Sequence, residues 1–263
     1  MVVAFSGWND AGEAATGALD HLWSAWDAQR FATLDPEEFV DFTANRPRIR
    51  VEAGVVESLE WPETEFGWCA PGGPTAVVLV RGPEPHLRWR TYCAEVLEVA
   101  EALGCSSVLT LGAMLSDVPH TRPTPVFTNA PTADLVDAAA LPTSQYDGPT
   151  GIPGVLHEQA HRAGFDSLSL WAAVPAYAAA VSSPAAMLAL IEQAAAVIGV
   201  AVAVDGLAGS AEDYVEQFDQ LCEDDDDTAE YVHRLEEAYD TESVHMGSAV
   251  ELVEEVEKFL RDQ

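Results

Sequence analysis

Lysine is almost missing from this sequence, since Lys258 is the only one among 263 residues. Lysine and arginine together number 12 against 44 aspartates and glutamates, which gives a formal net charge of −32 at pH 7. Such a negative field repels phosphate backbones and anionic lipid surfaces. We therefore expect neither nucleic acid nor a membrane among the partners of this protein.

Long apolar runs and export signals are also missing. No run approaches the roughly 18 apolar residues that a membrane-spanning helix needs, and no basic segment precedes the apolar start at Val2. These absences predict a cytoplasmic protein. Because the first expected strand begins at Val2 itself, we also expect a few native residues ahead of Met1.

Cysteine is scarce and shows no C-x-x-C spacing. The four cysteines lie mostly among apolar neighbours, which favours buried thiols over metal ligands or a disulfide. They are Cys69, Cys93, Cys105 and Cys222.

Apolar runs typical of strands alternate with helical stretches through the first 205 residues. The expected strands are 2–6, 31–34, 75–80, 107–111 and 168–174, and the expected helices are 10–28, 87–103, 154–163 and 185–198. An antiparallel ribbon is expected at 48–52 and 55–61, turning at Gly54. This alternation predicts an α/β fold, a three-layer αβα arrangement around a mainly parallel, mixed sheet.

The strand pattern stops at Gly206. Residues 206–263 hold 19 acidic and 3 basic residues, a net charge of −16, and Asp224–Asp227 lack the spacing of a calcium loop. We predict a core domain at 1–205 and an acidic helical appendage at 206–263. Three amphipathic helices are indicated by Tyr214/Phe218/Leu221, Tyr231/Leu235/Tyr239 and Val250/Val253/Val256/Leu260.

The segment Gly7-Trp8-Asn9-Asp10-Ala11-Gly12 spaces two glycines as a phosphate-binding loop does. Glu13 and Ala14 follow where such a loop has lysine and serine or threonine. We interpret the segment as a strand-to-helix turn in which Asn9 or Asp10 caps the helix. No cofactor is expected.

The segment 157–161 matches the H-E-x-x-H pattern of zinc hydrolases. On a helix, His157 and His161 share one face for zinc and Glu158 can act as the base. Ser167 stands where a metzincin has its third ligand, and Gly164 is explained as the end of the helix. We favour a solvated helix face without a metal, and keep a zinc hydrolase as the alternative.

The apolar run at 109–115 ends in a loop that carries Ser116, Asp117, His120 and Arg122. Polar side chains at the carboxyl end of a buried strand are typical of sites in open α/β sheets. These residues lie too close together in one loop to be assumed a hydrolytic triad, and no G-x-S-x-G motif occurs. Pairing of Asp117 or His120 with Arg122 would equally lock the proline-rich loop.

Five segments occur in the order that one known family shows: 7–12, 81–89, 111–123, 146–152 and 170–175. Together they resemble the proteasome assembly chaperone 2 (PAC2) family in its bacterial, actinobacterial-type branch. The resemblance implies a phosphorylase/hydrolase-like α/β core, a small homo-oligomer and, from eukaryotic and archaeal members, a role in assembling proteasome α-subunits. Members that dock into the α-ring end in a hydrophobic-Tyr-any tripeptide, whereas this chain ends Arg261-Asp262-Gln263, so that docking mode is not expected.

We therefore predict a non-catalytic protein that acts through protein contacts. The expected partners are further copies of the chain, in a homo-oligomer such as a trimer, and proteasome-related proteins. The alternative is a phosphorylase- or hydrolase-like enzyme acting on a small molecule, or the zinc hydrolase above. Several candidate residues are expected to meet in one cleft or subunit interface, unless they merely pin loops: Trp8, Asn9, Asp10, Glu84, Arg88, Asp117, His120, Arg122 and Tyr146.

Overall fold

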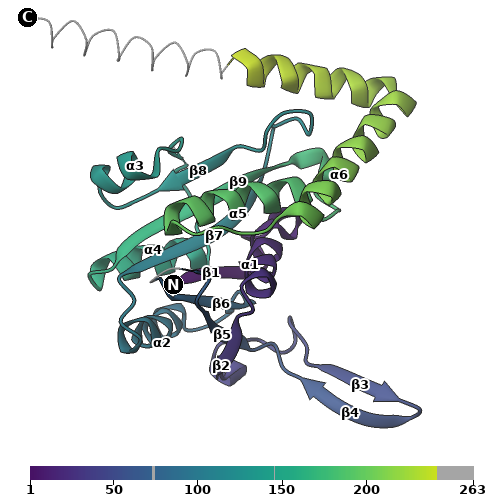
Figure 1. Cartoon of the computed structure of the whole chain (residues 1–263). Helices are drawn as coiled ribbons and strands as arrows, with labels where there is room; N and C mark the ends of the chain where they lie inside the picture. Colours follow the sequence, from purple (N-terminus) through teal and green to yellow (C-terminus); the bar gives the residue numbers. More distant parts are fainter. Residues whose placement is uncertain (73–74, 145, 242–263) are drawn as a thin grey trace, which may run out of the picture.

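The core of the protein is a seven-stranded mixed sheet in the order β2-β5-β6-β1-β7-β9-β8 (Figure 1). A computed structural model describes residues 1–72, 75–144 and 146–241. The sheet confirms the predicted α/β fold. Its strands are β1 (Val2–Ser6), β2 (Gln29–Leu34), β5 (Thr64–Cys69), β6 (Val77–Pro83), β7 (Ser107–Ser116), β8 (Val126–Asn129) and β9 (Asp166–Pro175).

The four central strands β6, β1, β7 and β9 are parallel to one another. The outer pairs β2–β5, β5–β6 and β8–β9 are antiparallel. The central strands are the continuous apolar runs of the sequence, as expected for strands that are covered on both faces. The sheet is therefore parallel at its centre and antiparallel at both margins.

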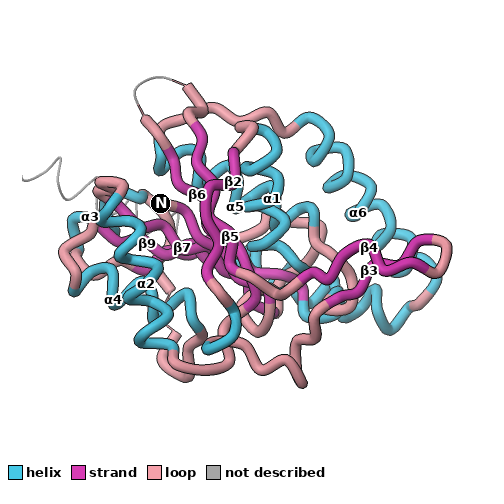
Figure 2. Tube along the Cα trace, turned by 90° about the horizontal axis from the view of Figure 1, so that it is seen from below, coloured by secondary structure: helices cyan, strands magenta, loops and turns pink. Residues whose placement is uncertain are grey.

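Helices cover both faces of the sheet (Figure 2). Helices α1 (Ala14–Ala25) and α5 (Pro184–Ile198) lie on one face, and α2 (Trp89–Ala102) and α4 (Ile152–Arg162) lie on the other. The short helix α3 (Ala133–Ala139) lies beside β8.

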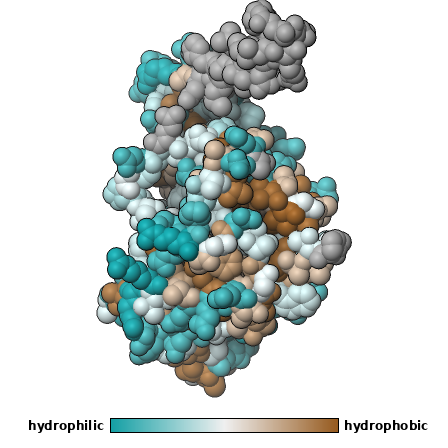
Figure 3. Space-filling model, turned by 90° about the vertical axis from the view of Figure 1, so that its left-hand side faces the viewer, coloured by the Kyte–Doolittle hydropathy of each residue, from teal (hydrophilic) through white to brown (hydrophobic). Residues whose placement is uncertain are grey.

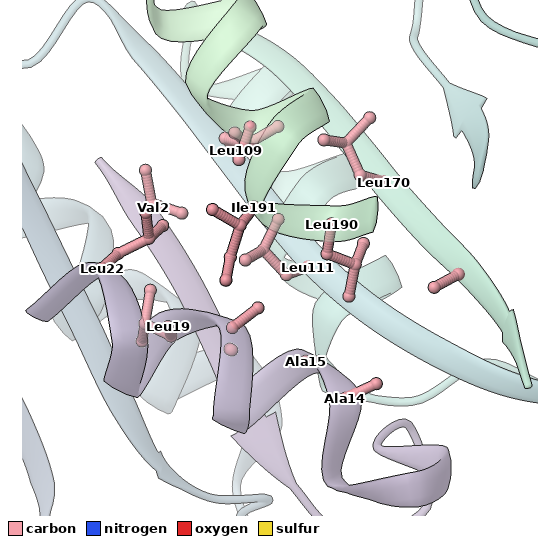
Figure 4. Close-up of a cluster of buried hydrophobic side chains, with 14 of the residues drawn as sticks. Val2, Ala14, Ala15, Leu19, Leu22, Leu109, Leu111, Leu170, Leu190 and Ile191 are labelled. Atoms are coloured by element: carbon pink, nitrogen blue, oxygen red, sulfur yellow. The ribbon is translucent and has the colours of Figure 1, made fainter. Parts of the chain in front are cut away.

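Successive residues of β1 point alternately into the two apolar clusters that lie on the opposite faces of the sheet. Val2 points into the cluster beneath α1 and α5, which Figure 4 shows with Leu19, Leu190 and Ile191. Its neighbour Val3 belongs to the cluster beneath α2 and α4. This two-residue period is the normal side-chain alternation of a strand.

Several boundaries differ from the predicted ones. Strand β7 continues to Ser116 rather than ending at Leu111, and α1 ends at Ala25 because Asp27 adopts a left-handed φ of 49°. Strands β5 and β8 and helix α3 were not predicted. Gly67 interrupts the apolar pattern of β5, and β8 has only four residues in a proline-rich stretch.

The predicted antiparallel ribbon is a hairpin arm that projects from the body of the molecule (Figures 1 and 2). It consists of β3 (Arg48–Glu52) and β4 (Val55–Glu60), which pair only with each other. Ala53 and Gly54 have φ values of 49° and 83°, as a type I′ turn requires. The turn at Gly54 is confirmed.

The chain leaves the sheet through α6 (Asp205–Asp224), which packs against α5, and residues 226–241 continue as a further helix. Tyr214 and Phe218 are buried as predicted, but Leu221 is 49% exposed because the apolar cluster under α6 ends at Phe218. The predicted helix around Val250 lies outside the described residues. Within the described part of the chain, no helix has the length and apolarity needed to cross a membrane.

The surface is not uniformly polar despite the large negative charge. Figure 3 shows a face on which hydrophobic areas interrupt the hydrophilic ones. Large apolar side chains that are more than half exposed include Trp8, Leu87 and Leu103 on the body, and others on the hairpin arm.

Gly112 on β7 should tolerate no side chain, because Trp171 on β9 lies opposite it. A Cβ atom built on Gly112 would lie 2.6 Å from Cε3 of Trp171. We expect Gly112→Ala to lower the free energy of unfolding by about 1–3 kcal/mol, measured by urea denaturation. The control is Gly206→Ala on α6, where nothing lies within 4 Å and alanine favours a helix. Equal effects of the two changes would contradict this explanation.

Candidate functional site

A cavity of about 700 Å³ opens at the carboxyl ends of the parallel strands. The chain leaves β1 toward β2 at one edge of the sheet and leaves β7 toward β8 at the other edge. A crevice at such a switch in direction is the usual ligand site of an open α/β sheet. Its walls come from the loop after β1, the end of β7, parts of β8, β9 and α4, and the loop 144–150 apart from residue 145.

Three aromatic side chains from separate segments line this cavity. Trp8 and Tyr146 are 66% and 63% exposed at its mouth, whereas Trp171 is partly buried over Gly112. The Trp171 indole N–H donates to Oγ of Ser169 at 2.7 Å, which fixes the ring on the sheet. The cavity therefore has a fixed aromatic ring on the sheet and two exposed aromatic rings at its rim.

The ionisable groups of the lining are acidic or neutral. Asp10, Asp147 and the imidazole of His157 line the cavity, and no lysine or arginine does so among the described residues. Burial raises the pKa of Asp10, although hydrogen bonds from Thr16 and Ala15 oppose this. The cavity is thus suited to a neutral or positively charged ligand.

Of the two predicted caps, Asn9 and Asp10, it is Asp10 whose side chain caps helix α1, although the helix begins later than expected, at Ala14. Its Oδ1 accepts hydrogen bonds from the backbone N–H groups of Ala15 and Thr16 at 2.8 and 3.0 Å. A 3-10 turn at Ala11–Glu13 separates the carboxylate from the first residue of the helix. A negative charge at a helix N-terminus is stabilised by the exposed N–H groups and the helix dipole.

Asn9 and Glu84 lie behind the cavity wall and hold it in place. Nδ2 of Asn9 donates to Oε1 of Glu84 at 2.8 Å, and the N–H of Ile152 donates to the same oxygen at 2.9 Å. Ile152 is the first residue of α4, whose own N-cap, Gly151, offers no side chain. Glu84 therefore ties the loops after β1 and β6 to the start of α4. Asn9 is 1% exposed, and its Oδ1 finds no partner among the described residues.

Asp117, His120 and Arg122 lie elsewhere, under the C-terminal helices. Arg122 forms two hydrogen bonds of 2.9 Å with the carboxylate of Asp240 and one of 3.1 Å with Glu236. His120 is 6% exposed, and its Nε2 lies 3.2 Å from Oδ1 of Asp219. These partners all come from the acidic tail of the same chain.

Aromatic side chains complete this second group. Tyr231 donates to Asp117 at 3.3 Å, and the hydroxyl of Tyr177 lies 2.7 Å from Nδ1 of His120. The rings of His120 and Phe218 are 5.6 Å apart. The loop 117–123 thus forms the contact surface for α6 and for the helix 226–241.

Acid should weaken this docking. Hydrogen bonds from Arg122 lower the pKa of Asp240, and a hydrogen bond from Thr121 lowers the pKa of Glu236. A carboxylate whose pKa is lower in the folded state stabilises that state above its unfolded pKa. The stabilisation disappears as pH falls through the folded pKa. The ion pairs therefore hold the tail at neutral pH.

Arg88 belongs to neither group. It precedes α2 with a left-handed φ of 55° and forms an ion pair with Glu38. The structure thus brings Trp8, Asn9, Asp10, Glu84 and Tyr146 to one end of the sheet and places the remaining candidates apart from them.

The H-E-x-x-H residues lie on α4, where His157 and Glu158 contact other side chains. Nδ1 of His157 lies 2.7 Å from Oγ of Ser167, and Glu158 pairs with Arg162 one turn along the helix. His161 is exposed, and Gly164 ends the helix with a φ of 92°. In the described ranges, no group of three or more His, Cys, Asp or Glu side chains could hold a metal ion.

The sequence model of the PAC2 family matches residues 4–222. The chain belongs to the PAC2 family. A Mycobacterium tuberculosis protein described as a proteasome-assembly chaperone homologue is 40% identical with a TM-score of 0.82, over 88% of this chain and 98% of that one. A PAC2 family protein from Streptomyces avermitilis is 43% identical with the same TM-score and coverage.

A more distant structure shares the PAC2 fold. The Pyrococcus furiosus protein described as an archaeal proteasome activator is 16% identical with a TM-score of 0.64, over 84% of this chain and 92% of that one. No curated protein matches the chain. The resemblance inferred from the sequence segments is therefore confirmed at the level of the family.

Most residues that line the cavity of this PAC2 protein were not among the candidates predicted from the sequence. Trp171, Asp147 and His157 line it, yet the first two appeared only inside family-like segments and His157 only as a zinc ligand. The signal that was available is the pairing of a bulky Trp171 with Gly112, which becomes visible only once the strand register is known.

Replacing Arg122 should loosen the tail. We expect Arg122→Gln to increase amide hydrogen exchange in residues 226–241, measured by mass spectrometry at neutral pH, because Asp240 and Glu236 lose their cationic partner. The matched control is Arg234→Gln, since Arg234 pairs with Glu230 on the same helix and holds nothing to the core. Unchanged exchange in Arg122→Gln would show that the aromatic contacts alone hold the tail.

Proposed function

We propose that this PAC2 protein is a non-catalytic assembly factor that acts by binding other proteins, beginning with further copies of itself. The observation that carries the proposal is the projecting β3–β4 arm. An isolated two-stranded hairpin is only marginally stable in water. An arm of this kind gains stability when another surface covers it.

The arm presents apolar side chains to solvent. Ile49 is paired with Leu59 across the two strands, and Val51 with Val56; their exposed fractions are 61%, 50%, 53% and 59%. Val55 at the turn is 66% exposed. Contiguous exposed apolar side chains on a soluble protein mark interaction sites. Among the described residues, β3 and β4 pair only with each other, which leaves one backbone edge of each strand for pairing with another chain.

The charge of the arm supports a second copy of this chain as the partner. Residues 46–60 hold three arginines and three glutamates, a net charge of zero in a chain of −32. Two acidic surfaces of this protein repel each other, whereas a neutral apolar arm can approach such a surface without that cost. A ring in which each arm reaches the next copy, such as a trimer, would cover every arm.

The family relationship supports a proteasome-related second partner. The relative from Mycobacterium tuberculosis that is 40% identical is described as a proteasome-assembly chaperone homologue. The alternative enzymatic function would place Asp117, His120 and Arg122 together in an enclosed pocket. The contacts of these residues with the acidic tail favour a structural role instead.

Removing the apolar surface of the arm should dissociate the oligomer. In the double variant Ile49→Lys and Leu59→Glu, opposite charges face each other across the strands, so the hairpin itself is supported. We expect the wild type to sediment as an oligomer and the variant as a monomer. The variant should keep the far-ultraviolet circular dichroism spectrum of the wild type, and its Tm should fall by no more than the stabilisation that association supplies. Leu103→Gln, which alters a 51% exposed leucine at the end of α2, is the control. A monomeric wild type, or a variant of wild-type mass, would overturn self-association through the arm.

Capture from the native cell tests the second partner. We expect the tagged full chain to enrich proteasome subunits, identified by mass spectrometry, relative to untagged cells. The same capture with the double variant Ile49→Lys and Leu59→Glu tests whether binding of proteasome subunits requires the oligomer. Failure to recover any proteasome subunit with the wild type would reject a proteasome-related partner.

A further inference from the structure

We propose that the cavity at the carboxyl ends of β1 and β7, beside Ser169 and Trp171 of β9, binds a small organic ammonium ion that carries a hydroxyl or similar polar group. The proposal concerns a ligand site, and it does not depend on the protein contacts of the arm. It rests on the aromatic lining, the charge of the lining and the size of the cavity.

Three aromatic side chains line this one cavity. Trp8 follows β1, Tyr146 lies in the loop before α4, and Trp171 lies on β9. A cation within about 6 Å of an aromatic ring centroid is attracted by the ring quadrupole, and cages of several rings recognise alkylated ammonium groups. The three rings lie in distant segments of the sequence, so their convergence is a property of the fold.

The charged side chains that line the cavity favour a positively charged ligand. Asp147 offers an exposed carboxylate, whereas both oxygens of Asp10 accept hydrogen bonds from the start of α1. The described lining contains no lysine or arginine. A phosphate or carboxylate ligand would have no cationic partner here, and the glycine-spaced loop after β1 lacks the lysine of a phosphate-binding loop. The net charge of −32 further attracts cations to the molecule.

The lining favours an organic cation over a metal ion. A metal ion would require several oxygen, nitrogen or sulfur ligands at short distances, whereas much of this lining is aromatic or aliphatic, with Met114 and Leu115 beside the rings. An alkylammonium needs no such ligands. Asn129 and Ser144 add neutral polar groups for a hydroxyl on the ligand. A volume of about 700 Å³ accommodates such a molecule together with water.

Isothermal titration calorimetry with two probes of similar shape tests the charge requirement. Choline is the cation, and 3,3-dimethylbutan-1-ol is its uncharged analogue. We expect choline to bind saturably at one molecule per chain, and the analogue to bind at least about tenfold more weakly. No saturable binding of choline up to about 10 mM, or equal affinities of the two probes, would overturn the proposal.

Variants test the assignment to this cavity. Trp8→Ala and Tyr146→Ala, both at exposed side chains, should each weaken choline binding by between about 2- and 30-fold, and Asp147→Asn should also weaken it. Trp68→Ala removes a tryptophan that is 49% exposed on β5, outside the cavity, and should leave choline affinity unchanged. Unaltered affinity in the three cavity variants would overturn the assignment. The arm variant Ile49→Lys and Leu59→Glu should bind choline like the wild type, so failure of this proposal is distinguishable from failure of self-association.

Discussion

The carboxylate of Glu84 is the contact on which the arrangement around the cavity depends. One of its oxygens accepts hydrogen bonds from Asn9 and from the first N–H of α4. It thereby joins the loops that follow β1 and β6 to a helix that lies about 70 residues further along the chain. Charge-assisted hydrogen bonds at a helix N-terminus are strong. This contact therefore fixes the loop after β1 and the start of α4, which both border the cavity.

The uneven distribution of charge organises the rest of the molecule. Few cationic groups are available, and Arg122 is one that the fold uses to hold the acidic tail against the loop after β7. The hairpin arm is neutral and the cavity lining is acidic. Docking of the tail therefore uses one of the few cations, Arg122. The same shortage of positive charge supports the two proposals, that the neutral arm approaches another copy and that the cavity takes a cationic ligand.

The length of β7 explains why the predicted site residues separate into two groups. The expected strand ended at Leu111, which would have left Asp117 and His120 beside the loop after β1. The observed strand continues to Ser116, five residues further, or about 16 Å at the rise of an extended chain. The loop 117–123 is therefore carried away from the cavity and reaches α6. Trp171 and Asp147 take the place of these residues in the cavity lining.

The sequence by itself determined the elements whose signals are local. Continuous apolar runs predicted the central strands, Gly54 predicted the turn of the arm, and the cap of α1 was narrowed to Asn9 or Asp10. Only the tertiary structure decided which segments meet, because Trp171 against Gly112 and Arg122 against Asp240 join residues 59 and 118 positions apart. The spacing of apolar residues along a helix or strand indicates which face is buried. It does not specify the register between strands or which element covers the buried face.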